Sequence, residues 1–336
     1  MSVLSAVAAC TGASWAQAPG STGGRITIAV GGQAVLYHLP LTIADRLGFF
    51  QAGGLDVHVR DFAGGALALQ AVHDGAAHVC SGAYEHTLLQ QSQGHDFRAF
   101  VVQGRAPQQA LGVSVRALPG YRRPADLRGR RVGVSAPGSS TQVMASVLLA
   151  RAGVDAREVS FVGVGTGATA VAALRTGRVH AVCHADPIMS LLEHRGEVRL
   201  VSDLRTLTAA QEVFGGAMPA SCLYAPQAFL HKEPMVAQAL TNAIVHALKW
   251  LQTASPADLI KAVPASYVLG DRAVYLAAFN RVRETFSPNG LMPEDGPATA
   301  LRALAQAYPH MASPRVSLPR TFTDDLARKA RQKFGV

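Results

Sequence analysis

A short run of small and hydroxyl-bearing residues, Pro137–Thr141 (PGSST), has the residue types and the spacing to bind a ligand. It joins a predicted strand to a predicted helix at 143–152. The first N–H groups of a helix lack partners and carry the positive end of its dipole, so this place favours an anion or a strong acceptor. The hydroxyl groups would add donors, although an ordinary helix cap explains them equally well. No Gly-Lys-Ser/Thr follows, which excludes a phosphate-binding P-loop.

Two later positions resemble this arrangement. Thr166-Gly167 also lies between a predicted strand and a predicted helix. Asp186 follows a short apolar strand and could accept a hydrogen bond from an amine or hydroxyl of a ligand. It could equally cap a helix whose first residue is Pro187, where the missing N–H of proline costs nothing. Both readings of Asp186 stay open.

Aromatic and small residues follow the predicted strands of the first part of the chain. Rings at the ends of strands could enclose a planar or apolar ligand, or they could pack between two lobes. We expect ligand contacts from the following candidates: Tyr37, His38, Phe62, Gly64, Ser81, Gly82, Tyr84, Gly138, Ser139, Ser140, Thr141, Thr166, Gly167 and Asp186.

No catalytic residue, metal or cofactor is expected. His78, Cys80, His180, Cys183 and His184 have the right chemistry for a metal, but neither cluster offers two ligands on one face with a carboxylate behind them. No G-x-S-x-G motif is present, and no histidine is placed by a serine signature. The pattern therefore favours binding over catalysis.

An internal repeat predicts that the chain contains two similar lobes. Residues 65–78 read GALALQAVHDGAAH, and residues 167–180 read GATAVAALRTGRVH. The two segments are identical at six of fourteen positions, including both final histidines. Two related lobes would leave a concave site between them, where small ligands commonly bind.

Strands alternate with helices along most of the chain, which predicts α/β lobes with mainly parallel sheets. Ligands bind such sheets beyond the carboxyl ends of the strands, where the candidate residues fall. The expected divisions are a leader and flexible start at 1–24, a first lobe at 25–113, a second lobe at 114–216, and a return to the first lobe with C-terminal helices at 217–336.

Length and charge agree with a two-lobed binding protein. A chain of 336 residues suits two domains. The formal net charge of +9 invites a nucleic-acid partner, but the basic residues are scattered apart from a cluster at 328–333, and aromatic residues do not interleave with them. We expect a monomer that takes a small molecule and no nucleic acid.

The N-terminal segment predicts export from the cytoplasm. Small and apolar residues at 3–9 lead to Ala16-Gln17-Ala18, which fits a signal-peptide cleavage site. No lysine or arginine precedes the apolar stretch, and a signal peptide that starts before Met1 would explain this. Lipidation of Cys10 in the sequence VAAC and an uncleaved tail are the alternatives. We expect a secreted, periplasmic protein.

Five segments together resemble periplasmic solute-binding proteins of ABC importers, in the group that takes aliphatic sulfonates, taurine, nitrate and thiamine-pyrimidine precursors. In order along the chain they are Ala44–Phe50 (ADRLGFF), Gly54–Val57 (GLDV), Gly75–Val79 (GAAHV), Asp126–Val134 (DLRGRRVGV) and Gly177–Val182 (GRVHAV). Each motif is loose, but their order and spacing are specific. The resemblance covers residues 25 to about 260.

The resemblance implies a type II periplasmic-binding-protein fold. Its two lobes would be joined by a two-strand hinge near 103–116 and 214–224, and they would close on a solute that a membrane permease then receives. His78 and His180 stand where this group often has aspartate, at positions that are usually structural. A sulfonate or nitrate ligand favours an arginine fork. The strand-end loops contain no arginine, and Arg105 is the nearest candidate. We therefore expect a neutral or weakly anionic solute, such as a heterocycle.

Two other functions are compatible with the same fold. An enzyme resembling the fungal thiamine-pyrimidine synthases would carry a cysteine-rich iron-binding motif, and this chain has none. The ligand-sensing lobe of a regulator usually accompanies a DNA-binding helix-turn-helix, and none precedes Arg25. Solute capture remains the favoured function.

Overall fold

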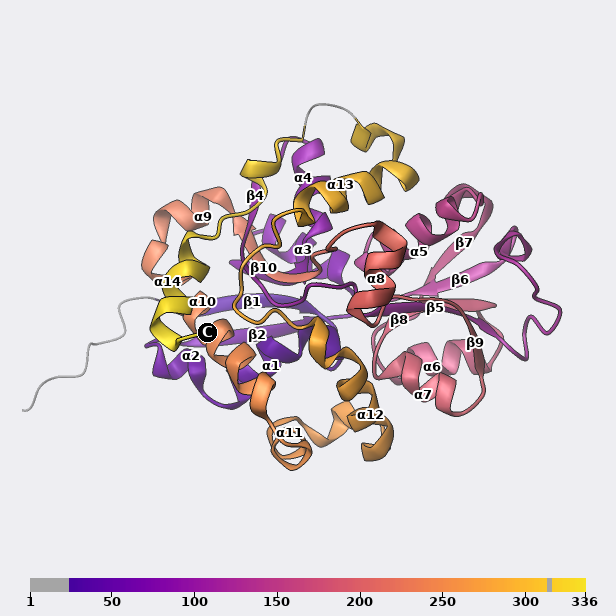
Figure 1. Ribbon diagram of the computed structural model, residues 1–336, viewed down its shortest axis with the longest axis horizontal. Coiled ribbons are helices and arrows are strands. Elements are labelled where there is room, and N and C mark those ends of the chain that lie inside the picture. Colours follow the sequence, from indigo (N-terminus) through magenta and orange to yellow (C-terminus); the bar gives the residue numbers. More distant parts are fainter. Residues whose placement is uncertain (1–23, 313–315) are drawn as a thin grey trace, which may run out of the picture.

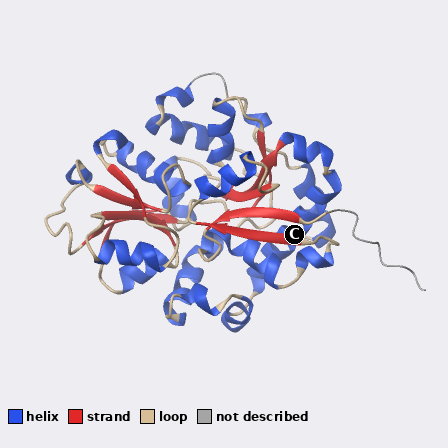
Figure 2. Ribbon diagram, turned by 180° about the vertical axis from the view of Figure 1, so that it is seen from behind, coloured by secondary structure: helices blue, strands red, loops and turns tan. Residues whose placement is uncertain are grey.

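The computed structural model describes residues 24–312 and 316–336. Within them, the chain forms two five-stranded sheets with the strand orders β2-β1-β3-β10-β4 and β7-β6-β8-β5-β9. The two lobes lie side by side, and helices cover both faces of each sheet (Figures 1 and 2). The predicted two-lobed α/β fold is confirmed. The expected leader, apart from Gly24, lies outside the described residues.

The first sheet contains β1 (Ile26–Gly31), β2 (Val57–Phe62), β3 (Val79–Ala83), β4 (Phe97–Val102) and β10 (Ser221–Pro226). Its helices before the first crossing are η1 (Leu36–His38), α1 (Leu39–Arg46), α2 (Phe49–Ala52), α3 (Gly65–His73) and α4 (Glu85–Ser92). The second sheet contains β5 (Gln109–Ser114), β6 (Arg131–Val134), β7 (Ser160–Gly163), β8 (Ala181–Ala185) and β9 (Val198–Asp203). Its helices are η2 (Pro124–Leu127), α5 (Ser140–Arg151), η3 (Ala156–Glu158), α6 (Ala168–Arg175), α7 (Ile188–His194) and α8 (Leu207–Phe214).

The segment after β10 is helical, as predicted. It contains α9 (Gln227–Lys232), α10 (Pro234–Thr253), α11 (Pro256–Ala262), η4 (Ala265–Val268), α12 (Arg272–Val282), η5 (Arg283–Thr285), α13 (Gly296–Ala307), η6 (Pro309–Ala312), η7 (Leu318–Arg320) and α14 (Asp325–Phe334). Helix α10 packs against α1 and α14, whereas α12 packs against α7 and α13 against α5. The C-terminal helices therefore pack against both lobes, whereas the sequence predicted a return to the first lobe only.

Burial explains the sequence patterns of the strands. The central strand β3 is buried at every residue, as a strand covered by helices on both faces requires. Strand β2 forms the sheet edge and mostly alternates between half-buried and exposed residues, which matches its alternating sequence.

The chain passes between the lobes twice. It leaves β4 for β5 through 103–108, and it returns from β9 to β10 through 204–220. In each sheet, the strand that follows the crossing runs against its neighbours, because β5 is antiparallel to β8 and β9, and β10 is antiparallel to β3 and β4. Strand β5 therefore belongs to the second lobe, and the chain leaves the first sheet before Gln109 rather than after residue 113. The polar stretch near 118–126 lies inside the second lobe, between β5 and β6.

The internal repeat corresponds to one structural unit that occurs once in each lobe. Its helices are α3 and α6, and its two histidines make the same contacts. His78 Nδ1 accepts a hydrogen bond from the Thr27 backbone N–H at 3.0 Å, and His180 Nδ1 accepts one from the Arg131 N–H at 3.1 Å. Each histidine thus fastens the turn after a helix to the strand β1 or β6, which lies beside the central strand of its sheet. A structural role explains both residues without a metal.

We predict that His180→Ala lowers the free energy of unfolding by about 1 kcal/mol, the usual contribution of one hydrogen bond. The accepting nitrogen must be unprotonated, and burial, with Arg131 and Arg130 nearby, lowers the pKa of His180. The loss should therefore be largest above pH 6.5 and shrink as the pH falls through the lowered pKa. Urea unfolding measures it. His58→Ala, at an exposed position of β2, is the control, and an equal loss in both variants would contradict the assigned role.

Candidate ligand-binding cleft

A cavity of about 40 Å³ lies between the lobes, where strands β1, β3, β6 and β8 end. A water molecule needs roughly 10–15 Å³ on this measure, so the closed cleft holds a few water-sized groups. The first lobe lines it with Gly31, Val35, Tyr37, His38, Gly65, Gly82, Ala83 and His86. The second lobe lines it with Gln109, Ser135, Ser139, Ser140, Thr141, Thr166, His184 and Ala185.

Half of the residues proposed from the sequence line this cavity. They are Tyr37, His38, Gly82, Ser139, Ser140, Thr141 and Thr166. They come together because all of them follow strands that end at the same edge of their sheet, as expected for parallel α/β lobes. The aromatic pair meets edge to face, since the rings of Tyr37 and His38 lie 4.9 Å apart at 82°.

The other two aromatic candidates do not line the cavity. Phe62 packs against the hydrophobic core, with the guanidinium of Arg60 5.3 Å above its ring. Tyr84 stands just before α4, is fully buried, and shares a hydrogen bond with the Thr321 hydroxyl at 2.6 Å. The expected enclosure of a ligand by four rings is therefore not formed by these side chains.

Four small candidates surround the cavity without lining it. Ser81 lies beneath His38, with its Oγ 3.2 Å from the imidazole Nδ1, and so positions that ring. Gly138 is exposed and donates its N–H to Gln142 Oε1. Gly64 packs against the second lobe, and Gly167 has no atom within 4 Å of its Cβ position.

Asp186 is a structural residue between the lobes. Its carboxylate accepts the Ser190 N–H at 2.7 Å, which caps α7, and it contacts the buried guanidinium of Arg205 at 3.3 Å. Its backbone oxygen accepts the Leu36 N–H of the first lobe at 2.8 Å. The carboxylate thus contacts the first turn of α7 as a cap would, although Pro187 occupies the cap position and α7 begins at Ile188.

The start of α5 joins the two lobes across the cleft. Ser139 Oγ accepts the Ala66 N–H at 2.9 Å, and the Ser140 hydroxyl donates to Glu85 Oε1 at 2.5 Å. The Ser140 oxygen in turn accepts a hydrogen bond from Gln109 Nε2 at 3.0 Å. A chain of hydrogen bonds thus runs from Gln109 through Ser140 to Glu85. Neither Glu85 nor Gln109 was among the sequence candidates.

The histidines of the cleft are uncharged at neutral pH. Burial lowers the pKa of His38 to about 3. Burial also lowers the pKa of His86 to about 4, which the backbone of Gly138 only partly opposes. His184 is satisfied within its own lobe, because its Nδ1 accepts the Ala185 N–H at 3.0 Å and its Nε2 lies 2.9 Å from the Gly165 oxygen.

Glu85 is the acidic member of the hydrogen-bond chain that runs from Gln109 through Ser140. Its side chain is buried, and burial raises the pKa of its carboxyl to about 7, although hydrogen bonds from Ser140 and from its own backbone oppose the rise. Burial and the Glu85 charge also raise the pKa of Tyr37 well above its usual range, against the effect of the nearby Ser140 hydroxyl. The Tyr37 hydroxyl therefore keeps its proton.

Three polar atoms of the lining are buried without a hydrogen-bond partner among the described residues. They are Tyr37 Oη, His86 Nε2 and Gln109 Oε1. The Ser140 hydroxyl lies near Tyr37 and the Gly138 backbone lies near His86, but neither contact has the geometry of a hydrogen bond. Buried polar groups almost always have partners, and one left without costs about 1–3 kcal/mol. Because all three border the same cavity, a bound molecule that pairs with them would recover this energy.

No arginine or lysine lines the cavity in the part of the chain that the structure describes. Arg105, the nearest candidate from the sequence, donates instead to the Glu284 backbone oxygen at 2.9 Å. Arg205 is fully buried and makes ion pairs with Asp186, Glu193 and Asp203. The cleft therefore lacks the guanidinium fork that anion sites favour.

Residues 24–312 and 316–336 contain neither a metal-binding cluster nor a membrane-spanning helix. No group of three or more metal-ligand side chains is close enough to hold a metal ion. None of the helices in these ranges is both long and apolar enough to cross a membrane.

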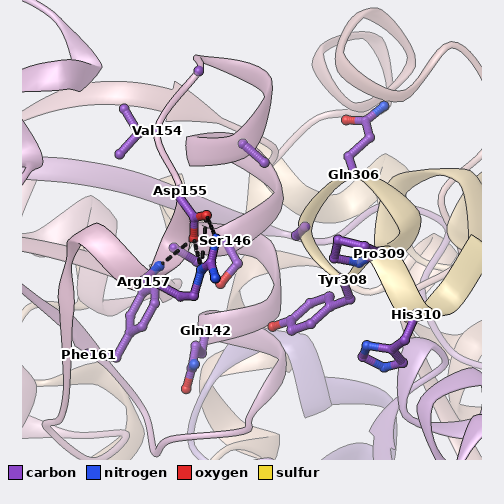
Figure 3. Close-up of a pocket in the computed structure, with 14 residues that line it drawn as sticks. Gln142, Ser146, Val154, Asp155, Arg157, Phe161, Gln306, Tyr308, Pro309 and His310 are labelled. Atoms are coloured by element: carbon purple, nitrogen blue, oxygen red, sulfur yellow. Dashed lines mark hydrogen bonds and ion pairs between the residues drawn. The ribbon is translucent and has the colours of Figure 1, made fainter.

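A larger hollow of about 600 Å³ lies outside the cleft, between α5 and the segment of α13 and η6 (Figure 3). Tyr308 and His310 approach it from one side, and Gln142 and Ser146 line the other. The ion pair of Asp155 with Arg157 at its rim is exposed. None of the sequence candidates lines this hollow, and the strand ends do not point to it. The smaller cleft is the better candidate site.

Comparison with known proteins gives a family match and solved structures that share the fold. A model of the NMT1/THI5-like family matches residues 35–257, whereas no curated protein matches the chain. A solved structure from Bordetella bronchiseptica RB50 is 52% identical, covers 93% of this chain and 98% of its own, and has a TM-score of 0.91. An alkanesulfonate-binding protein from Xanthomonas axonopodis pv. citri, bound to MOPS, is 18% identical over 89% and 98% of the chains, with a TM-score of 0.65. A desulfurization enzyme also shares the fold, at 18% identity over 92% and 100% of the chains, with a TM-score of 0.57.

We predict that Gly64→Ala keeps the lobes from closing. A Cβ at Gly64 would lie 2.6 Å from Ala136 Cβ and 2.9 Å from Ser139 Oγ, both in the second lobe. The φ of 177° at Gly64 is extended backbone that alanine adopts easily, so each lobe should fold normally. Small-angle X-ray scattering should give a larger radius of gyration than for the wild type. Gly167→Ala, before the equivalent helix with open space around it, should match the wild type, and a Gly64→Ala variant as compact as this control would contradict the prediction.

We predict that the difference in free energy of unfolding between Glu85→Gln and the wild type increases in favour of the variant as the pH rises from about 4.5 to about 7. Above pH 7 this difference should stay constant. The pKa of Glu85 is raised to about 7 from its ordinary 4.5. In this window the folded state therefore binds more protons than the unfolded state, and wild-type stability falls with rising pH. The relative gain should be roughly 1–3 kcal/mol, measured by urea unfolding. The exposed Glu212→Gln is the control, and a gain that does not change with pH would contradict the burial of an ionisable Glu85.

Proposed function

The chain belongs to the NMT1/THI5-like family, and we propose that it is the extracytoplasmic solute-binding component of an ABC import system. It captures a small organic solute, sulfonate-like or heterocyclic, when its two lobes close. The observation that carries this proposal is the cavity between the lobes, where three buried polar atoms lack partners. A solute enclosed by the closed lobes can pair with all three atoms at once.

The architecture supports capture and release. In the described residues the chain crosses between the sheets at 103–108 and 204–220, so rotation at a few backbone positions can open the cleft if the contacts of α12 with α7 and of α13 with α5 adjust. The lobes contact each other over the cavity through single hydrogen bonds such as Ala66 to Ser139. Such contacts favour closure without locking it. A membrane permease in the inner membrane would receive the solute from the open form, and the protein would act as a periplasmic monomer.

An enzyme is the alternative that one comparison favours, because a desulfurization enzyme shares the fold. The chemistry of the cleft speaks against it. The cysteines Cys80 and Cys183 are buried outside the lining, and burial raises the pKa of each thiol to about 12. A thiol with so high a pKa is a poor nucleophile. Of the three hydroxyl groups at the start of α5, that of Ser140 donates to a carboxylate and none is bonded to a histidine.

A melting-temperature screen of the chain from Gly24 onward tests solute capture. The panel contains sulfonates, taurine, nitrate, pyrimidines and carboxylates. A solute at 100 times its Kd stabilises the folded state by about 2.7 kcal/mol, which raises the Tm by several degrees. We expect one class to raise it and to be recovered unchanged by mass spectrometry. A panel without effect would contradict the proposal, and a solute recovered in altered form would replace it with the enzyme.

A further inference from the structure

We propose that the cleft selects an uncharged solute that both donates and accepts hydrogen bonds, and that it rejects sulfonate and nitrate anions. The inference rests on the proposed function, since it names the class of solute that the same cavity takes. Three features of the cavity carry it: its charges, the position of Glu85, and the unpartnered atoms of its lining.

The described residues that line the cavity include no positively charged side chain that could pair with an anion. Among the described residues that border the cavity, none is lysine or arginine, and its three histidines are neutral. The remaining positive potential comes from helix N-termini, above all that of α5, where Ser139 and Ser140 lie. A helix dipole contributes only about half an elementary charge at its end.

Glu85 already occupies the place beside these helix ends that an anion would take. It is the first residue of α4, and its carboxylate accepts the hydroxyl of Ser140, the first residue of α5. When ionised, it repels a second anion across a low-dielectric space. When protonated, it still offers no positive charge. In either state, a sulfonate or nitrate would enter a cleft without a cationic partner.

The hydrogen-bond chain also fixes what Gln109 offers to a solute. Glu85 accepts from Ser140, and Ser140 accepts from Gln109 Nε2, so the amide oxygen Oε1 is left unpartnered at the cavity. This oxygen can only accept a hydrogen bond. Sulfonate and nitrate have no donor to give, and their oxygens would stand against it. A solute with an N–H or O–H group would satisfy it.

The other two unpartnered atoms lie in the first lobe. The Tyr37 hydroxyl can donate or accept. His86 Nδ1 shares a hydrogen bond with the Tyr224 hydroxyl at 3.1 Å, and its Nε2 has no partner. When Tyr224 donates in that bond, Nε2 carries the proton and is the donor that His86 can offer to a solute, beside the backbone of Gly138. A carbonyl or ring nitrogen of the solute would accept from these groups. A cation would be attracted by an ionised Glu85, but Glu85 does not line the cavity, and the donors that do would face the cation.

Three isosteric probes that differ in charge, and with it in their hydrogen-bond donors and acceptors, test the proposal. Acetate, acetamide and acetamidinium are planar and of equal heavy-atom number, and they carry charges of −1, 0 and +1. Methanesulfonate and methanesulfonamide form a second pair. Each is titrated into the folded chain at pH 7.5 and constant ionic strength, with calorimetry and melting temperature as readouts. We expect each neutral member to bind at least tenfold more tightly than its charged partners.

Each other outcome of the titrations would overturn the proposal. A charged member that binds as tightly as its neutral partner excludes selection for uncharged solutes, and so does the absence of binding by all five probes. Native mass spectrometry of the chain purified from the periplasm separates this failure from failure of the proposed function. An anion carried unchanged would leave solute capture standing, whereas no carried solute together with no bound probe would overturn both.

A pair of tyrosine variants locates the binding. Tyr37 and Tyr275 are both buried, and both hydroxyls lack partners within the described residues, but only Tyr37 lines the cavity. Loss of one solute hydrogen bond should weaken acetamide binding about three- to tenfold in Tyr37→Phe. Tyr275→Phe should bind like the wild type. Equal affinities in the two variants, with both folded by circular dichroism, would overturn the role of Tyr37.

Discussion

The closed form of this protein depends on the first turn of α5. There, Ser139 accepts a backbone N–H from the first lobe, and Ser140 donates to the buried carboxylate of Glu85. Helix starts leave N–H groups unpaired, and this one is placed at the carboxyl ends of the strands of both sheets. The same turn therefore closes the cleft, borders its cavity and holds Gln109 in position. Opening the lobes breaks all of these contacts together.

The fold determines how the lobes enclose a solute, whereas the residues that line the cleft determine which solute can bind. This chain has two crossings and two related sheets with a cavity between them, and its fold is similar to that of an alkanesulfonate-binding protein. What would distinguish its solute is the lining, where neutral histidines, hydroxyls and an amide oxygen stand in place of basic side chains. The positively charged Arg205 is committed to three carboxylates outside the lining. Charge selection can thus change while the architecture stays constant.

The sequence revealed the parts of this structure that follow from local patterns. The PGSST run lies at a strand-to-helix junction, and three of its residues line the cavity because that junction alone determines their place. The internal repeat likewise marked one unit in each lobe. Glu85, His86 and Gln109 were missed because their importance arises from side chains more than twenty residues away along the chain. Strand β5 was assigned to the first lobe because a fully buried strand fits either sheet equally well.

A crystal structure of the chain purified with its natural solute tests the central claim most directly. We predict an uncharged molecule enclosed between the lobes, with its polar atoms within hydrogen-bond distance of Tyr37 Oη, His86 Nε2 and Gln109 Oε1, and with the Ser140 to Glu85 contact intact. An anion held by arginine side chains, or a solute bound outside the cleft, would contradict the account.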